Sequence, residues 1–113
     1  MPHIIVEYAE SLFDEAELVP LLQSIHESVA SSGLFVANQI KTRAYPFRAF
    51  TQGGEPAPYL HIQARIKAGR DNDNKKRLGE VILAGLKTRN IEASVVTVEI
   101  IDMDRGSYGK YIP

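Results

Sequence analysis

The chain has 113 residues, of which 44% are hydrophobic and 24% charged, and these values are typical of one globular domain. Thirteen Lys and Arg nearly balance fourteen Asp and Glu, so the net charge of −1 gives no support to binding of nucleic acid or of an anionic membrane. The absence of cysteine excludes disulfides, thiolate metal sites and cysteine nucleophiles. No apolar run approaches the ~20 residues that span a bilayer, and no signal peptide is visible, so we expect a cytoplasmic protein.

The first half of the chain passes from a strand pattern to a helix pattern and back. Residues 3–8 (HIIVEY) are rich in β-branched and aromatic side chains, which predicts a strand. Residues 11–14 fit a capping box, and a helical stripe follows. The stripe consists of Leu18, Leu21, Leu22, Ile25 and Val29. Pro20 either kinks this helix or marks where its regular part begins. Residues 31–33 (SSG) predict the end of the helix, and residues 38–47 predict a second strand.

The second half repeats this order after a break. Residues 51–58 (TQGGEPAP) contain two Gly and two Pro, which predicts a loop. Residues 60–67 alternate between apolar and polar side chains and predict a half-buried strand. Residues 71–74 offer several N-caps for a helix that ends near Asn90. Its apolar stripe consists of Leu78, Val81, Ile82 and Leu86. Residues 94–101 (SVVTVEII) predict the last strand.

The predicted order is therefore β-α-β, linker, β-α-β. Helical crossovers imply parallel strand pairs with right-handed connections, so we predict an α+β fold in which a four-stranded sheet carries both helices on one face. We expect a single domain over residues 1–113, with half-repeats at 2–50 and 59–103 and a C-terminal tail at 104–113. The matching order of the two halves indicates an internal duplication.

The second face of this sheet is polar. His61, Gln63, Arg65 and Lys67 alternate with the apolar residues of their strand, and Lys41 and Arg43 lie on another strand. One interpretation is a solvated face. The other is a face that packs against further subunits, most simply in a closed ring.

Pro2 is the residue with the clearest candidate role in catalysis. Met1 is normally removed when a small residue follows it, and its removal would leave Pro2 with a free secondary amine. An apolar pocket or nearby cations would disfavour the charged form and lower the pKa of this amine. A neutral amine is a competent general base or nucleophile. The three histidines, at positions 3, 26 and 61, lack the spacing of metal ligands.

If the substrate of this candidate base is a carboxylated enol, the site also needs cationic residues to bind it. Arg70 lies between a predicted strand and a predicted helix, where ligand contacts are common. A guanidinium can bind a carboxylate through two parallel hydrogen bonds. The alternative for Arg70 is a solvated loop arginine, and the alternative for Lys41 and Arg43 is the polar face described above.

The sequence resembles the 5-carboxymethyl-2-hydroxymuconate isomerases of the tautomerase superfamily, and its second half resembles the short 4-oxalocrotonate tautomerases. The segments that carry this resemblance are Pro2–Glu7, Gly33–Phe35, Ile40–Arg43, Gly69–Asp71 with Lys75, and Met103–Gly109. Each segment is weak alone, but their order and spacing together are specific.

The resemblance implies a homotrimer that isomerises unsaturated hydroxy-dicarboxylates of aromatic catabolism without a cofactor. Pro2 would be the general base and Arg70 the carboxylate-binding arginine. Lys41 falls where the isomerases have a second arginine, so the bidentate contact is lost. Arg43, on the same face, could compensate. Tyr108 falls where the short tautomerases place an aromatic that walls the pocket, although it could instead pack the tail at a subunit interface.

Two other functions fit the same residues. One is a non-catalytic trimeric module that binds small acids through Lys41, Arg43 and Arg70. The other is an unrelated regulatory domain of ferredoxin-like fold.

Overall fold

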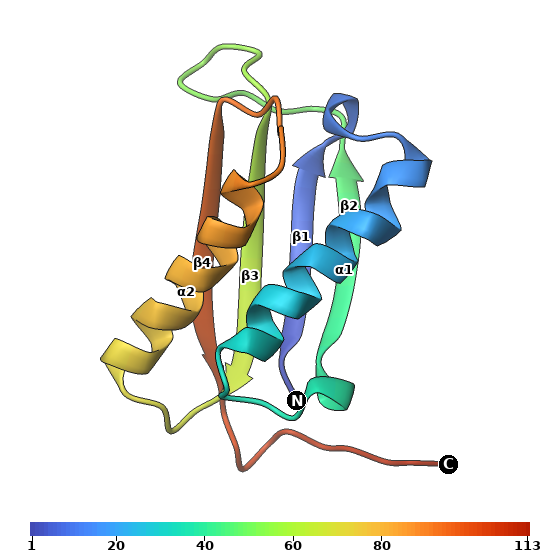
Figure 1. Ribbon diagram of the computed structural model, residues 1–113. Coiled ribbons are helices and arrows are strands. Elements are labelled where there is room, and N and C mark those ends of the chain that lie inside the picture. The colour runs from blue at the N-terminus through green and yellow to red at the C-terminus, as the bar shows by residue number, and fades with distance from the viewer.

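The computed structural model describes residues 1–113, and Figure 1 shows one sheet covered by two helices. The elements in chain order are β1 (His3–Ala9), α1 (Glu15–Ser31), β2 (Lys41–Phe47), β3 (Tyr59–Lys67), α2 (Asn72–Lys87) and β4 (Val95–Met103), with short 3₁₀ turns at Glu10–Leu12 and Ala37–Gln39. No helix is long and apolar enough to cross a membrane.

The sheet has the strand order β2-β1-β3-β4. β1 pairs with β2, and β3 with β4, in parallel, while β1 and β3 are antiparallel. Both helices lie on the same face of the sheet. This arrangement confirms the predicted α+β architecture of two consecutive β-α-β units.

The core lies between the helices and the sheet, because each element turns an apolar side toward the other layer. On the central strands Ile4 and Val6 alternate with half-buried residues, as do the buried apolar residues of β3. Leu21, Ile25 and Val29 are the buried positions of α1, and its counterpart α2 buries Leu78, Ile82 and Leu86. These residues recur every three or four positions, so the predicted helical stripes are confirmed.

The start of α1 corrects the sequence prediction. Ser11 lies in a 3₁₀ turn and does not begin a capping box. Asp14 is the N-cap, and its backbone N–H donates to Oε1 of Glu17 at 2.8 Å. Pro20 lies inside the helix, so regular helix does not begin there. Its ring removes one backbone donor on the exposed side of α1, a loss that the packing of the opposite side offsets.

Other boundaries move by a few residues. Strand β2 begins at Lys41 and not at residue 38, because residues 37–39 form a 3₁₀ turn. Helix α2 ends at Lys87 and not near Asn90, and β4 extends to Met103. The N-cap of α2 is Asp71, whose side chain accepts from the backbone N–H of Asn74 at 2.8 Å, as the cluster of cap candidates predicted.

The face of the sheet away from the helices carries both polar and apolar side chains. It carries Lys41 and Arg43 on β2, and the alternating polar residues of β3 lie on the same face, with β1 between the two strands. His61 bridges two residues of β4, because its Nε2 donates to the carboxylate of Glu99 at 2.8 Å and its Nδ1 lies 2.7 Å from the hydroxyl of Thr97. No helix covers this face in the single chain.

The antiparallel β1–β3 pairing brings four chain segments to one end of the sheet. The first residues of β1 and β2 meet the last residues of β3 and β4 there, and the long β2–β3 loop lies at the opposite end. The N-terminus, the β3–α2 connection and the C-terminal tail are therefore neighbours in space although they are distant in sequence.

The contact between the two helices predicts a stability effect that depends on Ser28. A Cβ at Gly85 of α2 would lie 2.2 Å from the Ser28 hydroxyl of α1. We expect Gly85→Ala to destabilise the protein by about 1 kcal/mol through overpacking. In a Ser28→Ala background the clash is gone, and the same change should stabilise by about 0.5–1 kcal/mol because alanine favours a helix over glycine.

Urea unfolding of the four proteins in this cycle would measure both effects. Equal effects of Gly85→Ala on the free energy of unfolding in the two backgrounds would contradict the close contact between Gly85 and Ser28.

Candidate active site at the N-terminal end of the sheet

A cavity of about 210 Å³ opens beside the N-terminus. Its lining residues come from the N-terminus, the α1–β2 connection, the end of β3 and the C-terminal tail, and are Met1, Leu34, Phe35, Val36, Gln39, Lys67, Arg70 and Arg105. Three of these side chains are cationic and none is acidic, so the cavity is suited to an anion with an apolar body.

Pro2 is completely buried behind this cavity. Its carbonyl accepts a hydrogen bond from the backbone N–H of Lys41 at 3.1 Å, which joins the residue to the first position of β2. Met1 is half-buried and lines the cavity itself. The nitrogen of Pro2, which is bonded to Met1, therefore lies next to the cavity and is held by the sheet.

The electrostatic surroundings of the terminus are strongly biased against positive charge. Burial lowers the pKa of the N-terminal amine from its ordinary value of 8.0, and the nearby charges of Lys41, Lys110, Lys67 and Arg70 lower that pKa further. Both causes favour the neutral amine, the form that can accept a proton.

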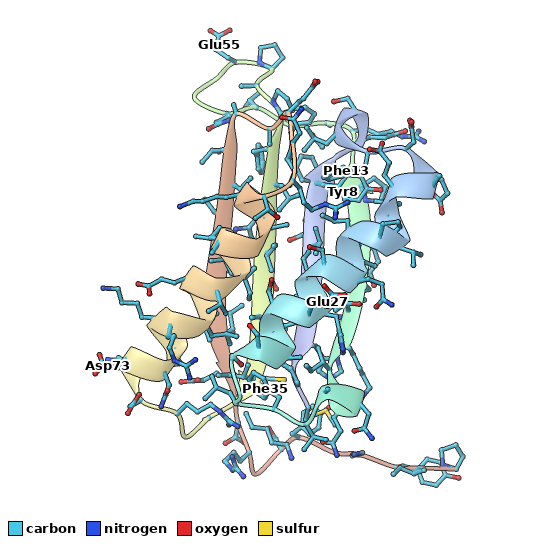
Figure 2. All side chains as sticks on the ribbon, viewed as in Figure 1. Tyr8, Phe13, Glu27, Phe35, Glu55 and Asp73 are labelled. Carbon is cyan, nitrogen blue, oxygen red and sulfur yellow. The ribbon has the colours of Figure 1, made fainter.

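Arg70 is held in place by two contacts from the α1–β2 connection. Its Nη2 donates to the carbonyl of Leu34 at 2.7 Å, and its guanidinium carbon lies 4.8 Å from the ring centroid of Phe35. Figure 2 labels Phe35 at the end of the sheet where the N-terminus lies. The preceding Gly69 has a φ of +130°, a conformation that strains any L side chain. The turn between β3 and α2 thus presents one arginine in a fixed orientation, with donors left for a ligand.

Lys41 and Arg43 occupy different surroundings although both lie on the open face of β2. The charge of Lys41 acts on the N-terminal amine. Arg43 lies over the ring of Tyr45, 5.9 Å from its centroid, and does not line the cavity. Lys41 does not line the cavity either, but it lies beside Pro2, whereas Arg43 lies one alternation further along the strand.

Tyr108 lies beside the N-terminus but is not among the residues that line the cavity, so its role as a pocket wall stays a prediction. Its hydroxyl contacts the sulfur of Met1 and lies 2.8 Å from Nε2 of His3. The ammonium of Lys67 lies 5.3 Å from the centre of the Tyr108 ring. The tail after β4 therefore folds back on its own N-terminus.

Three residues of this end were not predicted as site residues: His3, Lys67 and Arg105. Lys67 appeared only as part of the polar strand face, and Arg105 only as part of the resemblance. Arg105 is placed by a hydrogen bond from its Nη1 to the carbonyl of Ala68 at 3.1 Å. The signal available in the sequence was that Lys67 and Arg105 flank the ends of two strands expected to be parallel neighbours.

The surroundings of His3 favour its uncharged form. Burial lowers its pKa from the ordinary 6.5, and the positive charges of Arg43, Lys41, the N-terminus and Arg65 lower that pKa further. No group of three or more His, Cys, Asp or Glu side chains is placed to hold a metal ion.

Comparison with known proteins identifies the family. The family model for 5-carboxymethyl-2-hydroxymuconate isomerase matches residues 2–99. The chain belongs to this isomerase family. Membership confirms the predicted resemblance and the predicted class of enzyme, an isomerase, and it contradicts the alternative of an unrelated ferredoxin-like domain.

Individual relatives agree with this result. The 5-carboxymethyl-2-hydroxymuconate Delta-isomerase of Escherichia coli is 28% identical over 90 residues, which are 78% of this chain and 71% of the relative. A 5-carboxymethyl-2-hydroxymuconate isomerase structure from Deinococcus radiodurans R1 has a TM-score of 0.78 at 24% identity, covering 97% of this chain and 88% of that chain. A wild-type fused 4-OT symmetric trimer has a TM-score of 0.74 at 16% identity, covering 90% and 87%. The fold of the isomerase is thus tautomerase-like.

The electrostatics of the terminus can be tested directly. Lys41→Gln should raise the pKa of the N-terminal amine, because removal of a neighbouring positive charge makes the ammonium form less unfavourable. The pH dependence of the rate at which the terminal amine reacts with an acylating reagent reports this pKa. Lys87→Gln, at the end of α2, is the matched control and should leave it unchanged. An unchanged pKa in Lys41→Gln would show that the Lys41 charge does not act on the terminus.

Proposed function

We propose that this isomerase acts without a cofactor on unsaturated hydroxy-dicarboxylates similar to 5-carboxymethyl-2-hydroxymuconate, with Pro2 as the general base after removal of Met1. The observation that carries the proposal is a half-buried terminus, with Pro2 completely buried behind it, next to a cavity that is lined by cations and lacks acidic residues. An anionic substrate and a neutral amine are the two partners that such a site favours.

The amine of Pro2 would lie in the same environment that lowers the pKa of the Met1 amine. Once Met1 is removed, burial and the charges of Lys41, Lys67 and Arg70 would hold the pKa of the Pro2 amine below its ordinary value. The amine would take a proton from one carbon of the keto tautomer of the substrate and return it to another carbon. The electron pair of the broken C–H bond would meanwhile be delocalised onto a substrate oxygen.

The proposed carboxylate contact is Arg70. One of its N–H groups donates to Leu34, the Phe35 ring fixes its plane, and its other donors are available for a bidentate contact. Lys41 would add charge near the base, and Tyr108 would wall the cavity. The role predicted for Arg43 stays a prediction, and its place on the open face suits a site shared with a neighbouring subunit.

Fixed cations also support the chemical step. Charge that develops on oxygen in the dienolate-like intermediate would be stabilised by several kcal/mol in a site where positive groups are already oriented. Arg70 is oriented by two contacts and Arg105 by one, so little reorganisation would accompany the reaction.

We also propose a homotrimer that functions in cytoplasmic catabolism of aromatic compounds. The polar face of the sheet, with Lys41 and Arg43, would then lie between subunits. This assembly is supported by the structural similarity to a symmetric trimer and by the general tendency of an open sheet face to be covered in closed rings.

The role of the base is tested with protein whose Met1 removal has been verified by intact mass. Pro2→Ala should lower kcat for a 2-hydroxymuconate-type acid by about 100-fold or more, in the range expected for loss of a positioned general base. Ultraviolet absorbance of the conjugated acid follows the reaction. Unaltered kcat in this variant would overturn the assignment of the base.

The role of Arg70 is tested by Arg70→Ala, with Arg48→Ala as the control. Arg48 pairs with Glu10 outside this cavity. Loss of a charge-assisted contact worth about 1.5–3 kcal/mol should raise KM by roughly 10- to 150-fold in the Arg70 variant, and KM of the control should stay at the wild-type value. Binding of the acid to the wild type without any turnover would favour the non-catalytic binding module instead.

A further inference from the structure

A second polar pair lies beside Met1, behind the residues that line the cavity, and has no role in the chemistry proposed so far. His3 follows Pro2 on β1, and its Nε2 lies 2.8 Å from the hydroxyl of Tyr108 in the C-terminal tail. The two rings are tilted by 54° with their centres 5.9 Å apart, so the pair meets through its polar atoms and not through stacked faces. Both side chains are half-buried, which makes the hydrogen bond more costly to leave unmade than one in open water.

The Tyr108 hydroxyl also faces the space that Met1 occupies. Its only other side-chain contact is the sulfur of Met1. Met1 separates Tyr108 from the cavity, so its removal would leave that direction of the hydroxyl without a partner and would open it toward the cavity that Met1 lines. The hydroxyl would then have one fixed neighbour, His3, and one free direction toward a bound substrate.

We propose that Tyr108 is a catalytic residue whose hydroxyl donates a hydrogen bond to the substrate oxygen on which negative charge develops, and that His3 is a positioning residue that holds this hydroxyl. The inference rests on the proposed function of Pro2, and it adds a polar role to a residue that the sequence indicated only as an aromatic wall.

The hydrogen-bond roles follow from the chemistry of the two groups. For the O–H of Tyr108 to point at the substrate, its oxygen must accept from His3, so Nε2 of His3 carries the proton and Nδ1 the lone pair. Donation to the phenol oxygen polarises the O–H bond and makes it a stronger donor. The cations around His3 lower its pKa and favour the neutral ring, which avoids another charge beside the base.

The proton count of the reaction is unchanged by this contact. The Pro2 nitrogen takes the proton from carbon, the electron pair moves through the conjugated system onto oxygen, and Tyr108 donates a hydrogen bond to that oxygen while keeping its own proton. The proton on Pro2 then passes to a different carbon, and the electron pair returns from oxygen. The Lys67 ammonium, 5.3 Å from the Tyr108 ring centre, adds positive potential at the place where the charge develops.

The test compares kcat and KM of processed protein carrying Tyr108→Phe, His3→Leu, or both. Tyr108→Phe keeps the aromatic wall and removes the donor, so kcat should fall by about 100-fold while KM stays within about threefold of wild type, as for an interaction made mainly in the transition state. Tyr111→Phe, in the exposed tail, is the control and should keep wild-type kcat.

The double variant separates positioning from packing. If His3 acts through Tyr108, His3→Leu should lower kcat in the wild-type background and have little further effect when Tyr108 is already Phe. His3→Gln, which places an amide N–H near the former Nε2, should recover part of the loss. Thermal unfolding of each variant shows whether it is folded.

The possible failures are distinguishable. Wild-type kcat in Tyr108→Phe, in protein whose wild type turns over the acid and whose Pro2→Ala variant does not, would overturn this inference alone. Independent, multiplicative losses in the double variant would overturn the role of His3. Absence of turnover in the wild type would overturn the proposed function itself.

Discussion

The antiparallel ladder between β1 and β3 is the constraint on which the site depends. Each β-α-β unit by itself has parallel strands, so all of its strand beginnings lie at one end. The ladder that pairs Ile4 with Ala64 and Val6 with Ile62 reverses the second unit relative to the first. As a result the N-terminus meets the β3–α2 turn. Without this reversal Pro2 and Arg70 would lie at opposite ends of the sheet.

The same constraint concentrates positive charge at one end of a chain that is nearly neutral. Lys41, Lys67, Arg70 and Arg105 come from four separate segments, and no acidic side chain lines the cavity between them. Uncompensated like charges weaken folding, and natural proteins keep such arrangements mainly where a ligand compensates them. The buried core behind the cavity provides the stability that tolerates this cost, because Ile4, Ala64 and Ile66 are completely buried.

Membership of the isomerase family indicates the type of reaction, and the structure shows which residues lie at the candidate site. Conservation of the fold among relatives of low identity is expected, since hydrophobic alternation and helix stripes set the layers. The contacts of Arg70 with Leu34 and Phe35, and of Tyr108 with His3, are specific to side chains that come from distant segments. They indicate a site that is oriented before a substrate enters.

The sequence by itself determined the layers and the parallel pairs, and it indicated Pro2 and Arg70 as candidate site residues, because periodicity and the chemistry of single residues are local properties. It placed the cap of α1 at Ser11, three residues before the observed Asp14, since both positions fit a similar local pattern. Only the tertiary structure decided how the two units face each other. It alone brought Lys67 and Arg105 to the N-terminus and joined Tyr108 to His3, because these contacts depend on the direction of one strand pairing and on the path of the tail.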